Sequence, residues 1–286
     1  MTFPVTEKEQ YASDVYRIQV VAPRVTRRAR AGQFVIVRVD EKGERIPLTL
    51  MDFSPERGTV DMVFQAVGTT TDKLSLLKPG GCLLDVVGPL GRPTEIPQGE
   101  KAACLGGGVG IAALYPIARA FVEAGNDVRI MLGSRDREHL ILTDRMGEFG
   151  VPLLLATDDG SVGTRGFVTS LLEQVVGEWR PDRVIAVGPV PMMRAVSNLT
   201  RELGIPTTVS LNAIMLDGTG MCGTCRCEVG GETKFSCVDG PEFDGHLVNF
   251  DLLISRLSAY LDEEKESRAR FRSMAGEYPS ARGDGQ

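Results

Sequence analysis

The chain has 286 residues, of which 42% are hydrophobic and 24% are charged, and its net charge is −6 with a pI near 5.2. This length exceeds the ~100–150 residues of a common single domain, so we expect two compact units and an appendage. The acidic balance excludes the basic face of a nucleic-acid-binding protein, and no apolar run approaches the ~20 residues that span a bilayer. The chain starts without a basic and apolar signal region, so we expect a cytoplasmic protein with no nucleic-acid or membrane partner.

Short β-rich runs separated by turn residues dominate residues 14–88 and predict a small antiparallel barrel. One helix-like insert is expected from Thr70 to Leu77. Beyond Pro97 the pattern changes to apolar strands that alternate with amphipathic helices, which indicates a parallel sheet covered by helices on both faces. The expected fold class is therefore a β barrel followed by an α/β domain, with the boundary in the link at 95–99.

Regular patterns stop after Ser210, where a Gly- and Cys-rich stretch begins. A helix-like segment follows at 250–264, and the charged end of the chain is expected to be a flexible tail. These changes of pattern predict four ranges: 1–97, 98–210, 211–265 and the tail at 266–286.

Four of the six cysteines lie close together: Cys222, Cys225, Cys227 and Cys237. In a cytosolic chain such clustering indicates metal or redox chemistry rather than structural disulfides. The other cysteines, Cys82 and Cys104, lie in apolar, strand-like runs, where we expect buried and unreactive thiols.

Part of this cluster has the spacing D-x4-C-x2-C-x11-C, which is the plant-type [2Fe–2S] ferredoxin spacing with aspartate in the first position. Neighbouring glycines allow the backbone to wrap closely around such a cluster. Zinc is the alternative, because C-x2-C is also a zinc spacing and His246 lies nearby. The pattern is formed by Asp217, Cys222, Cys225 and Cys237.

The identity of the fourth ligand is open from the residues alone. Asp217 occupies the position where the spacing expects a ligand, whereas Cys227 offers a softer thiolate. On an extended segment Cys225 and Cys227 would share one face, so geometry does not exclude Cys227. A further interpretation makes Asp217 a turn residue of the D-G-T-G run.

A Gly-rich loop, CLGGGVGIAAL, follows a predicted strand and opens a predicted helix. Gly108, Gly110 and Ala113 fit the G-x-G-x-x-[GA] dinucleotide fingerprint, in which the backbone and a helix N-terminus approach a pyrophosphate. Ser134 and Arg135 stand where an acidic residue usually binds the ribose. Arg135 could meet a 2′-phosphate or line the adenosine site, so the choice between NAD and NADP stays open. A tight turn without a ligand is the structural alternative.

Two further turns, at 157–160 and 188–192, follow predicted parallel strands. The carboxyl ends of such strands gather at one edge of the sheet, where ligands bind. Each turn is therefore either a part of the nucleotide site or an ordinary loop.

With these motifs in order, residues 1–210 resemble the ferredoxin–NADP reductase superfamily, and nearly the whole chain resembles electron-transfer subunits of the dihydroorotate dehydrogenase type. The run SLNAIMLDGTGMCGTCRCEVGGETKFSCVDGPEFDGH resembles the small subunits of NADH-dependent reduced ferredoxin:NADP oxidoreductases, which are also called sulfide dehydrogenase subunits. The resemblance implies an FAD-binding barrel at 1–97, an NAD(H)-binding domain at 98–210 and a [2Fe–2S] segment at 211–265.

The resemblance also assigns residues, because Arg45 opens an R-x-[YP]-x-[ST] flavin motif and Gly68 opens a pyrophosphate-binding segment. The implied FAD-binding residues are Arg45, Pro47, Leu48, Thr49, Gly68, Thr69, Thr70, Thr71, Gly88 and Pro89. The implied NAD(H)-binding residues are Gly107, Gly108, Gly110, Ser134, Arg135, Asp158 and Met192. In the branch that this sequence matches the first cluster ligand is aspartate, so the implied ligands are Asp217, Cys222, Cys225 and Cys237.

The implied activity is that of an NAD(H)-dependent oxidoreductase subunit that moves electrons between NAD(H), FAD and the [2Fe–2S] cluster. The cofactors carry this chemistry, so neither His139 nor His246 needs a catalytic role. The resemblance implies a heterodimer, whose larger partner resembles the glutamate synthase small subunit, carries FAD and [4Fe–4S] clusters, and reacts with ferredoxin by flavin-based electron bifurcation.

Two alternatives remain for the function. The chain could serve dihydroorotate oxidation or a sulfide/polysulfide reductase, with the same cofactors and a different partner. It could also be a non-catalytic redox sensor that binds nucleotide without turnover.

Overall fold

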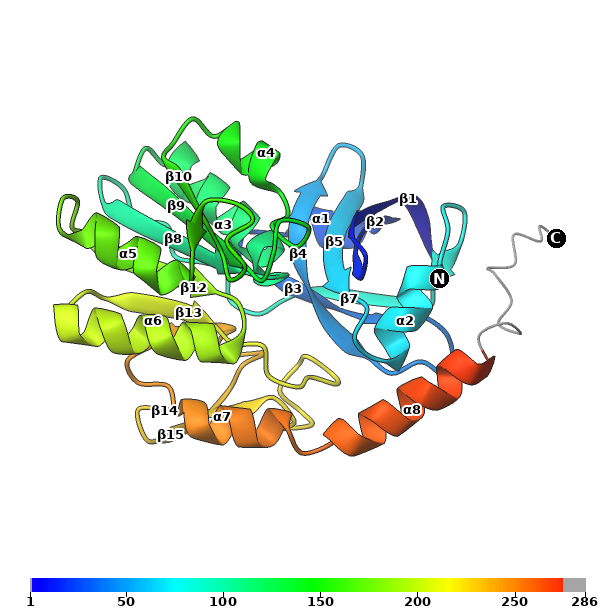
Figure 1. The fold of residues 1–286 in the computed structure, drawn as a ribbon. Helices are drawn as coiled ribbons and strands as arrows, with labels where there is room; N and C mark the ends of the chain where they lie inside the picture. Colours follow the sequence, from blue (N-terminus) through cyan, green and yellow to red (C-terminus); the bar gives the residue numbers. More distant parts are fainter. Residues whose placement is uncertain (1, 275–286) are drawn as a thin grey trace.

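The computed structural model of the chain describes residues 2–274. An antiparallel barrel lies beside a parallel sheet flanked by helices, and a smaller segment lies below both in the view of Figure 1. The barrel is formed by the first part of the chain, and the parallel sheet by the second. This architecture confirms the predicted fold class.

The barrel strands run in the order β6-β1-β2-β5-β4-β3-β7. They are rich in β-branched residues, and alternate side chains point inward, so that Ile18 and Val20 of β2 are fully buried. The expected helical insert corresponds to α2. The elements are β1 (Phe3–Ala12), β2 (Val15–Val21), α1 (Pro23–Thr26), β3 (Phe34–Arg38), β4 (Ile46–Ser54), β5 (Thr59–Gln65), α2 (Thr69–Leu76), β6 (Cys82–Leu83) and β7 (Asp85–Leu90).

The second sheet has the order β11-β10-β9-β8-β12-β13-β16 and is parallel except for its last strand. Side chains of α3 and α4 pack on one face and those of α5 and α6 on the other, as expected from the alternating pattern. The elements are β8 (Lys101–Gly107), α3 (Gly110–Glu123), β9 (Asp127–Ser134), α4 (Thr143–Gly147), β10 (Leu153–Thr157), β11 (Thr164–Arg165), α5 (Val168–Val176), β12 (Arg183–Val187), α6 (Val190–Leu203) and β13 (Thr207–Ser210).

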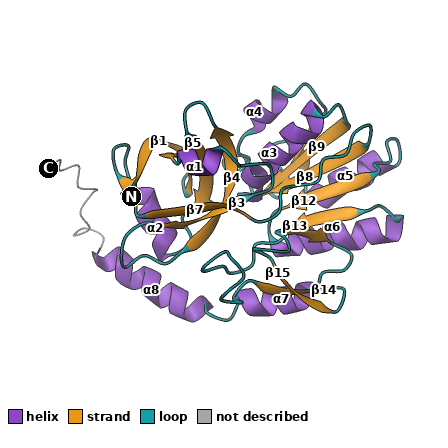
Figure 2. Cartoon of the chain, turned by 180° about the vertical axis from the view of Figure 1, so that it is seen from behind, coloured by secondary structure: helices purple, strands orange, loops and turns teal. Residues whose placement is uncertain are grey.

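The Cys-rich segment has little regular structure of its own and is attached to the second sheet. Its strand β16 pairs antiparallel with β13, so the third segment supplies the edge strand of the α/β sheet. A short hairpin and one helix complete it (Figure 2). The elements are β14 (Arg226–Val229), β15 (Glu232–Phe235), β16 (Glu242–Asp244) and α7 (Phe250–Leu257).

The expectation of a buried thiol is confirmed for Cys104 and wrong for Cys82. Cys82 and Leu83 make up the edge strand β6, in which neighbouring side chains point to opposite faces. Leu83 is fully buried, so Cys82 faces outward. A sequence of apolar neighbours does not say which face of an edge strand is covered.

The end of the chain differs from the expected tail, because 266–274 belongs to a second helix, α8 (Leu261–Met274). This helix returns to the barrel and packs against α2 (Figures 1 and 2). Arg268 and Arg272 both pair with Asp72, so charges that suggested a solvated tail take part in tertiary contacts. Residues 275–286 of the expected tail lie outside the described residues. Among the helices of residues 2–274, none has the length and apolar character needed to cross a membrane.

Candidate functional site

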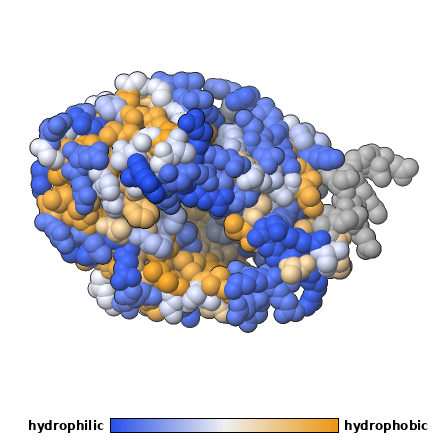
Figure 3. All heavy atoms as spheres, viewed as in Figure 1, coloured by the Kyte–Doolittle hydropathy of each residue, from blue (hydrophilic) through white to orange (hydrophobic). Residues whose placement is uncertain are grey.

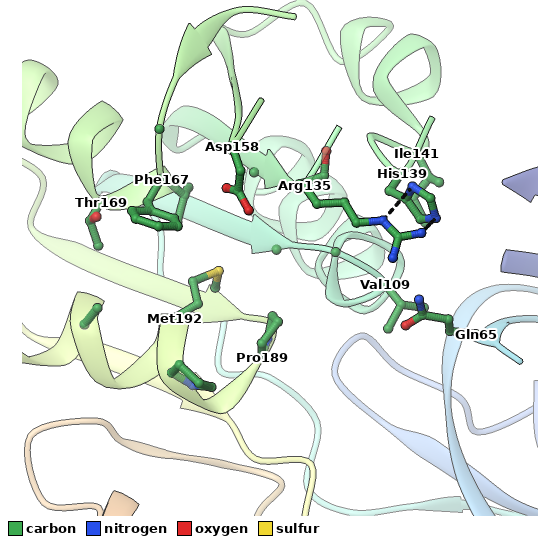
Figure 4. A pocket seen from close by; sticks show the side chains of 18 of the residues that line it. Gln65, Val109, Arg135, His139, Ile141, Asp158, Phe167, Thr169, Pro189 and Met192 are labelled. Carbon is green, nitrogen blue, oxygen red and sulfur yellow. Dashed lines mark hydrogen bonds between the residues drawn. The ribbon is translucent and has the colours of Figure 1, made fainter. Parts of the chain in front are cut away.

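A cavity of about 500 Å³ opens where β8, β9 and β10 end and α6 begins. Parallel strands bring these loops to one edge of the sheet, as the two turns at 157–160 and 188–192 led us to expect. Figure 4 shows the side chains of Arg135, Asp158 and Met192 around this space. Of the residues implied for NAD(H), those that line it are Gly107, Gly108, Ser134, Arg135, Asp158 and Met192.

The Gly-rich loop after β8 has a shape that requires glycine at two positions. Gly108 has a φ of +53°, which is in the left-handed region. A Cβ on Gly110 would lie 2.6 Å from both the Gly188 Cα and the Val187 carbonyl oxygen, so a side chain there would push two loops apart. Gly110 lines a second cavity rather than the nucleotide cavity, which differs from the implied NAD(H) set.

The second cavity, of about 530 Å³, lies between the barrel and α3. In Figure 3 hydrophobic atoms surround a hollow on the face of the molecule shown in Figure 1. Both cavities fall in the ~300–1,000 Å³ range of cofactor sites, and the residues present fit dinucleotides. The implied FAD residues that line it are Pro47, Leu48, Thr49 and Thr71.

The other residues implied for FAD lie outside the cavity wall. Arg45 is half exposed, with its Nη2 3.8 Å from the Asp85 carboxylate. The segment 68–71 opens α2, and the backbone N–H of Gly68 donates to the Thr71 hydroxyl at 2.9 Å. Gly88 and its neighbour Pro89 belong to β7, where a Cβ on Gly88 would meet a Val35 methyl at 2.7 Å.

The nucleotide cavity and the second cavity are joined. Gln65, Gly108, Val109 and Pro189 line both of them. The chain between β13 and the Cys-rich loop also lines the second cavity, up to Met215. Asp217, the first candidate cluster ligand, is only two residues further on.

The candidate cluster ligands form two pairs in the Cys-rich loop. The Sγ atoms of Cys225 and Cys237 are 3.2 Å apart and buried. The Asp217 carboxylate accepts a hydrogen bond from the Cys222 backbone N–H at 2.8 Å. Among residues 2–274, no three acidic, Cys or His side chains converge on a single point as ligands of one metal ion. Paired thiol and carboxylate donors fit a two-iron cluster, in which each iron takes two protein ligands.

The contacts of Asp217 and Cys227 bear on the fourth ligand. Asp217 also accepts from the Thr219 N–H at 2.8 Å, which is the turn contact that the alternative interpretation predicted. Cys227 is buried on β14, where its sulfur contacts the Ser236 hydroxyl at 3.5 Å and the Lys234 carbonyl oxygen at 3.7 Å. The sulfur of Cys227 is thus engaged by β15 and the residue after it, which favours Asp217 as the ligand.

The lining residues that were not identified as site residues from the sequence include Gln65, Val109, His139 and Phe167. Phe167 is 68% exposed at the mouth of the nucleotide cavity, where an aromatic face is available to a base (Figure 4). In the sequence Phe167 reads as part of the apolar stripe of the next helix. The glycine before it could have indicated an unusual loop from the sequence, and in the structure Gly166 has a φ of +132°.

His139 joins the two units beside the nucleotide cavity. It lies between Asp136 at 2.7 Å, which follows β9, and Asp14 at 2.9 Å, which is in the β1–β2 turn. Burial by itself lowers the pKa of His139, but the hydrogen bonds to Asp136 and Asp14 outweigh burial and raise this pKa above its usual value. Gln65 donates to the same Asp14 carboxylate at 2.8 Å, so the contact extends to the junction of the cavities.

Known proteins resemble this chain both in its Cys-rich segment and over nearly its whole length. Residues 212–249 match the family model described as the iron–sulfur cluster binding domain of dihydroorotate dehydrogenase B. Over 273 residues, 96% of either chain, the sequence is 50% identical to the dihydroorotate dehydrogenase B (NAD(+)) electron transfer subunit homolog of Thermotoga maritima.

Solved structures extend the likeness to the fold. A chain of the NADH-dependent reduced ferredoxin-NADP oxidoreductase, described in connection with flavin-based electron bifurcation, is 48% identical and superposes with a TM-score of 0.90, over 95% of this chain and 98% of that one. A ferredoxin NADP+ reductase from Neisseria gonorrhoeae shares the fold at 17% identity and a TM-score of 0.61, over 71% of this chain and 91% of that one. The chain therefore belongs to the family of dihydroorotate dehydrogenase B electron-transfer subunits, which makes it an oxidoreductase subunit that works with a partner.

Proposed function

We propose that this chain is the NAD(H)-dependent iron–sulfur flavoprotein subunit of an electron-bifurcating oxidoreductase that serves ferredoxin and NADP(H). The continuity of the sites carries the proposal. The nucleotide cavity meets the second cavity at Val109, and the second cavity extends to Met215 beside the cluster segment. One chain thus holds a nucleotide cavity that would supply hydride, a second cavity for the flavin, and a cluster segment that would pass on single electrons.

FAD, NAD(H) and a [2Fe–2S] cluster supply hydride exchange and single-electron transfer when they are bound. The chain holds and orients them. The backbone of Gly107 and Gly108, which lines the nucleotide cavity, would hold the NAD(H) pyrophosphate, and Pro47, Leu48 and Thr49 of the second cavity would hold the flavin. Val109 lies at the junction of the cavities, where its side chain would help to exclude water from the two cofactors.

The surroundings of Arg135 favour NAD(H) over NADP(H). Its Nε donates to the Asp136 carboxylate at 3.2 Å, and its guanidinium also contacts His139. Asp158 adds another carboxylate to the wall. A 2′-phosphate would meet two carboxylates and an arginine that is already paired, which is an unfavourable site for additional negative charge.

For the partner, we propose a larger subunit that resembles the glutamate synthase small subunit and carries FAD and [4Fe–4S] clusters. The chain has a one-electron outlet but, within residues 2–274, no second candidate cluster segment to receive those electrons. Leu216, Met221 and Val238 are exposed beside the candidate ligands, which suits a docking surface. The six cysteines are free thiols, as in the cytoplasmic location that we propose.

Anaerobic purification followed by metal, sulfide and flavin analysis tests the cofactor set. We expect iron and labile sulfide in equal amounts together with FAD, and reduction of the flavin by NADH more readily than by NADPH. Zinc in place of iron, or a chain without flavin, would contradict the proposal.

The companion chain and the reaction separate this function from its alternatives. Mass spectrometry of the native complex should identify a larger iron–sulfur flavoprotein, whereas a dihydroorotate dehydrogenase or a sulfide-reducing partner would support the runner-up. NADH-dependent dye reduction distinguishes an enzyme from a redox sensor, which would bind nucleotide tightly without turnover. A lone chain that reduces ferredoxin at the full rate would rule out the larger partner.

A further inference from the structure

The helix α8 is held on the barrel by charged contacts. It follows the cluster segment and α7, and it lies along α2 in both ribbon views (Figures 1 and 2). Most of its side chains are charged and exposed, and among the described residues of α8 Phe271 alone is buried. So small an apolar contact does not dock a helix by itself, since one buried aromatic side chain contributes only about 1.5–3 kcal/mol.

Asp72 of α2 is the centre of the contact and is buried. Arg268 donates to both of its carboxylate oxygens, at 2.8 and 2.9 Å, and Arg272 donates to it at 2.8 Å. Burial alone would raise the pKa of Asp72, but the hydrogen bonds from the two arginines lower it below the usual range. Such bidentate, charge-assisted contacts are the stronger class of ion pair.

The same helix holds the chain on both sides of the α2 N-terminus. Arg268 also donates to the carbonyl oxygen of Ala66, and the Ser267 and Thr69 hydroxyls are 2.9 Å apart. The second cavity reaches Val67 and Thr71 within this segment. Residues 66–72, which carry the implied pyrophosphate-binding run, are therefore fixed from outside by α8.

The charges around Asp72 bear on how the N-terminus of α2 would bind a pyrophosphate. A carboxylate near the first turn of α2 would repel a dinucleotide pyrophosphate bound at that helix N-terminus. Asp72 with Arg268 and Arg272 gives one negative and two positive charges, a net +1. The Glu44 carboxylate, which accepts from the Thr70 hydroxyl at 3.3 Å, adds a second negative charge, so the two arginines of α8 offset the two carboxylates at the first turn of α2.

We propose that α8 is a clasp on the FAD site, in which Arg268 and Arg272 hold Asp72 and the 66–72 segment in the conformation that retains the FAD pyrophosphate. The inference rests on the proposed function only for the identity of the dinucleotide. Arg268 and Arg272 are positioning residues, because they act through Asp72 and the α2 N-terminus.

The test is the rate of FAD release from the full chain, followed by the flavin fluorescence that appears after dilution. The double variant Arg268→Gln/Arg272→Gln should release FAD about tenfold faster than the wild type, since two charge-assisted contacts are lost. The control is Arg270→Gln, which removes one positive charge from the same helix, where Arg270 pairs with Glu266 and not with Asp72. The control should release FAD at the wild-type rate.

Hydrogen exchange and salt provide further readouts. Amides of 261–274 and of the α2 N-terminus should exchange faster in the double variant and not in Arg270→Gln. In the wild type, rising ionic strength should speed FAD release, because the Arg272 side chain is 60% exposed and salt screens its ion pair with Asp72. This salt series also decides the matter if the double variant does not fold.

The outcomes separate the two proposals. A wild-type chain that contains no FAD would contradict the proposed function. A wild type that holds FAD, together with a folded double variant that releases it at the wild-type rate, would overturn the clasp and leave the proposed function intact. Salt-independent release from the wild type would also overturn the clasp.

Discussion

The two cavities, that is the nucleotide cavity and the second cavity, differ from the Cys-rich loop in how they are built. The cavities lie at the ends of long strands, and residues of β8 such as Ala103 and Leu105 behind them are fully buried. The Cys-rich loop has short strands, and Gly218, Gly220 and Gly223 all have positive φ angles. The packed sheet fixes the walls of the cavities, whereas we expect the conformation of the Cys-rich loop to depend on its cluster, since metal binding to such segments is coupled to their folding.

The largest effect should follow from removing a buried cluster ligand. Cys225→Ser should lose most of its iron and sulfide, because Cys225 is buried against Cys237 and a hydroxyl is a poor iron ligand. Metal analysis measures the loss. Hydrogen exchange should rise across 211–249 but not in β8, and NADH binding should remain. Cys82→Ser, at an exposed thiol of the barrel, is the control; equal exchange in β8 and the loop would remove the contrast between the two regions.

The next largest effect should follow from a substitution in the Gly-rich loop beside the cavities. Gly110→Ala places a methyl group 2.6 Å from backbone atoms of the β12–α6 loop, so it should lower the free energy of unfolding by about 1–3 kcal/mol and weaken nucleotide binding. Denaturant unfolding and NADH titration measure these changes. Gly177→Ala, whose Cβ would face open space in a helical conformation, should cost nothing. Normal stability of Gly110→Ala would show that the two loops separate easily.

A smaller effect is expected at the fourth ligand position. Asp217→Ala should destabilise the cluster and Asp217→Cys should retain it, because the position decides the ligand and both carboxylate and thiolate bind iron. Cys227→Ala should leave the iron content unchanged, since its sulfur is engaged by Ser236 and Lys234. Iron analysis and the absorption spectrum follow the cluster. Loss of iron in Cys227→Ala, with none in Asp217→Ala, would reverse the assignment.

The smallest effect is a pH dependence at the contact between barrel and α/β domain. His139 has a raised pKa, so its charged contacts with Asp14 and Asp136 should stabilise the fold fully below about pH 6.5 and lose effect as the pH rises through that raised pKa. Both carboxylates have lowered pKa values, so their part is lost only under acid conditions, below about pH 4. Arg135 also faces the imidazole and opposes its charge.

Thermal unfolding of the wild type and His139→Gln across this range checks the prediction. The difference in stability between the two proteins should be largest near pH 5–6 and shrink toward pH 8, as expected for a histidine that titrates near ~6.5 or above. A constant difference would mean that His139 acts through packing alone.

Much of the architecture could be predicted from the sequence because it depends on local patterns. Short β-rich runs separated by turn residues predicted the barrel, and the strand–helix alternation predicted the parallel sheet. The Gly-rich loop at 106–110 indicated a dinucleotide site because its pattern reflects a local backbone requirement, as the positive φ of Gly108 shows. The cysteine spacing indicated an iron–sulfur segment for the same reason, since its ligands are close in sequence. The residue-level cofactor assignments and domain limits stay predictions.

Contacts between distant segments were decided only by the tertiary structure. His139 reads as a neutral surface residue until the β1–β2 turn brings Asp14 against it, 125 positions away in the sequence. Arg268 and Arg272 read as part of a solvated tail until α8 meets Asp72, which is 196 positions from Arg268. The sequence by itself determined the fold class and indicated an iron–sulfur segment and a dinucleotide loop, because periodicity and ligand spacing are local, whereas the flavin was implied by the family resemblance. It did not determine which charges pair, because an isolated charge carries no local signal of the partner that the fold brings to it.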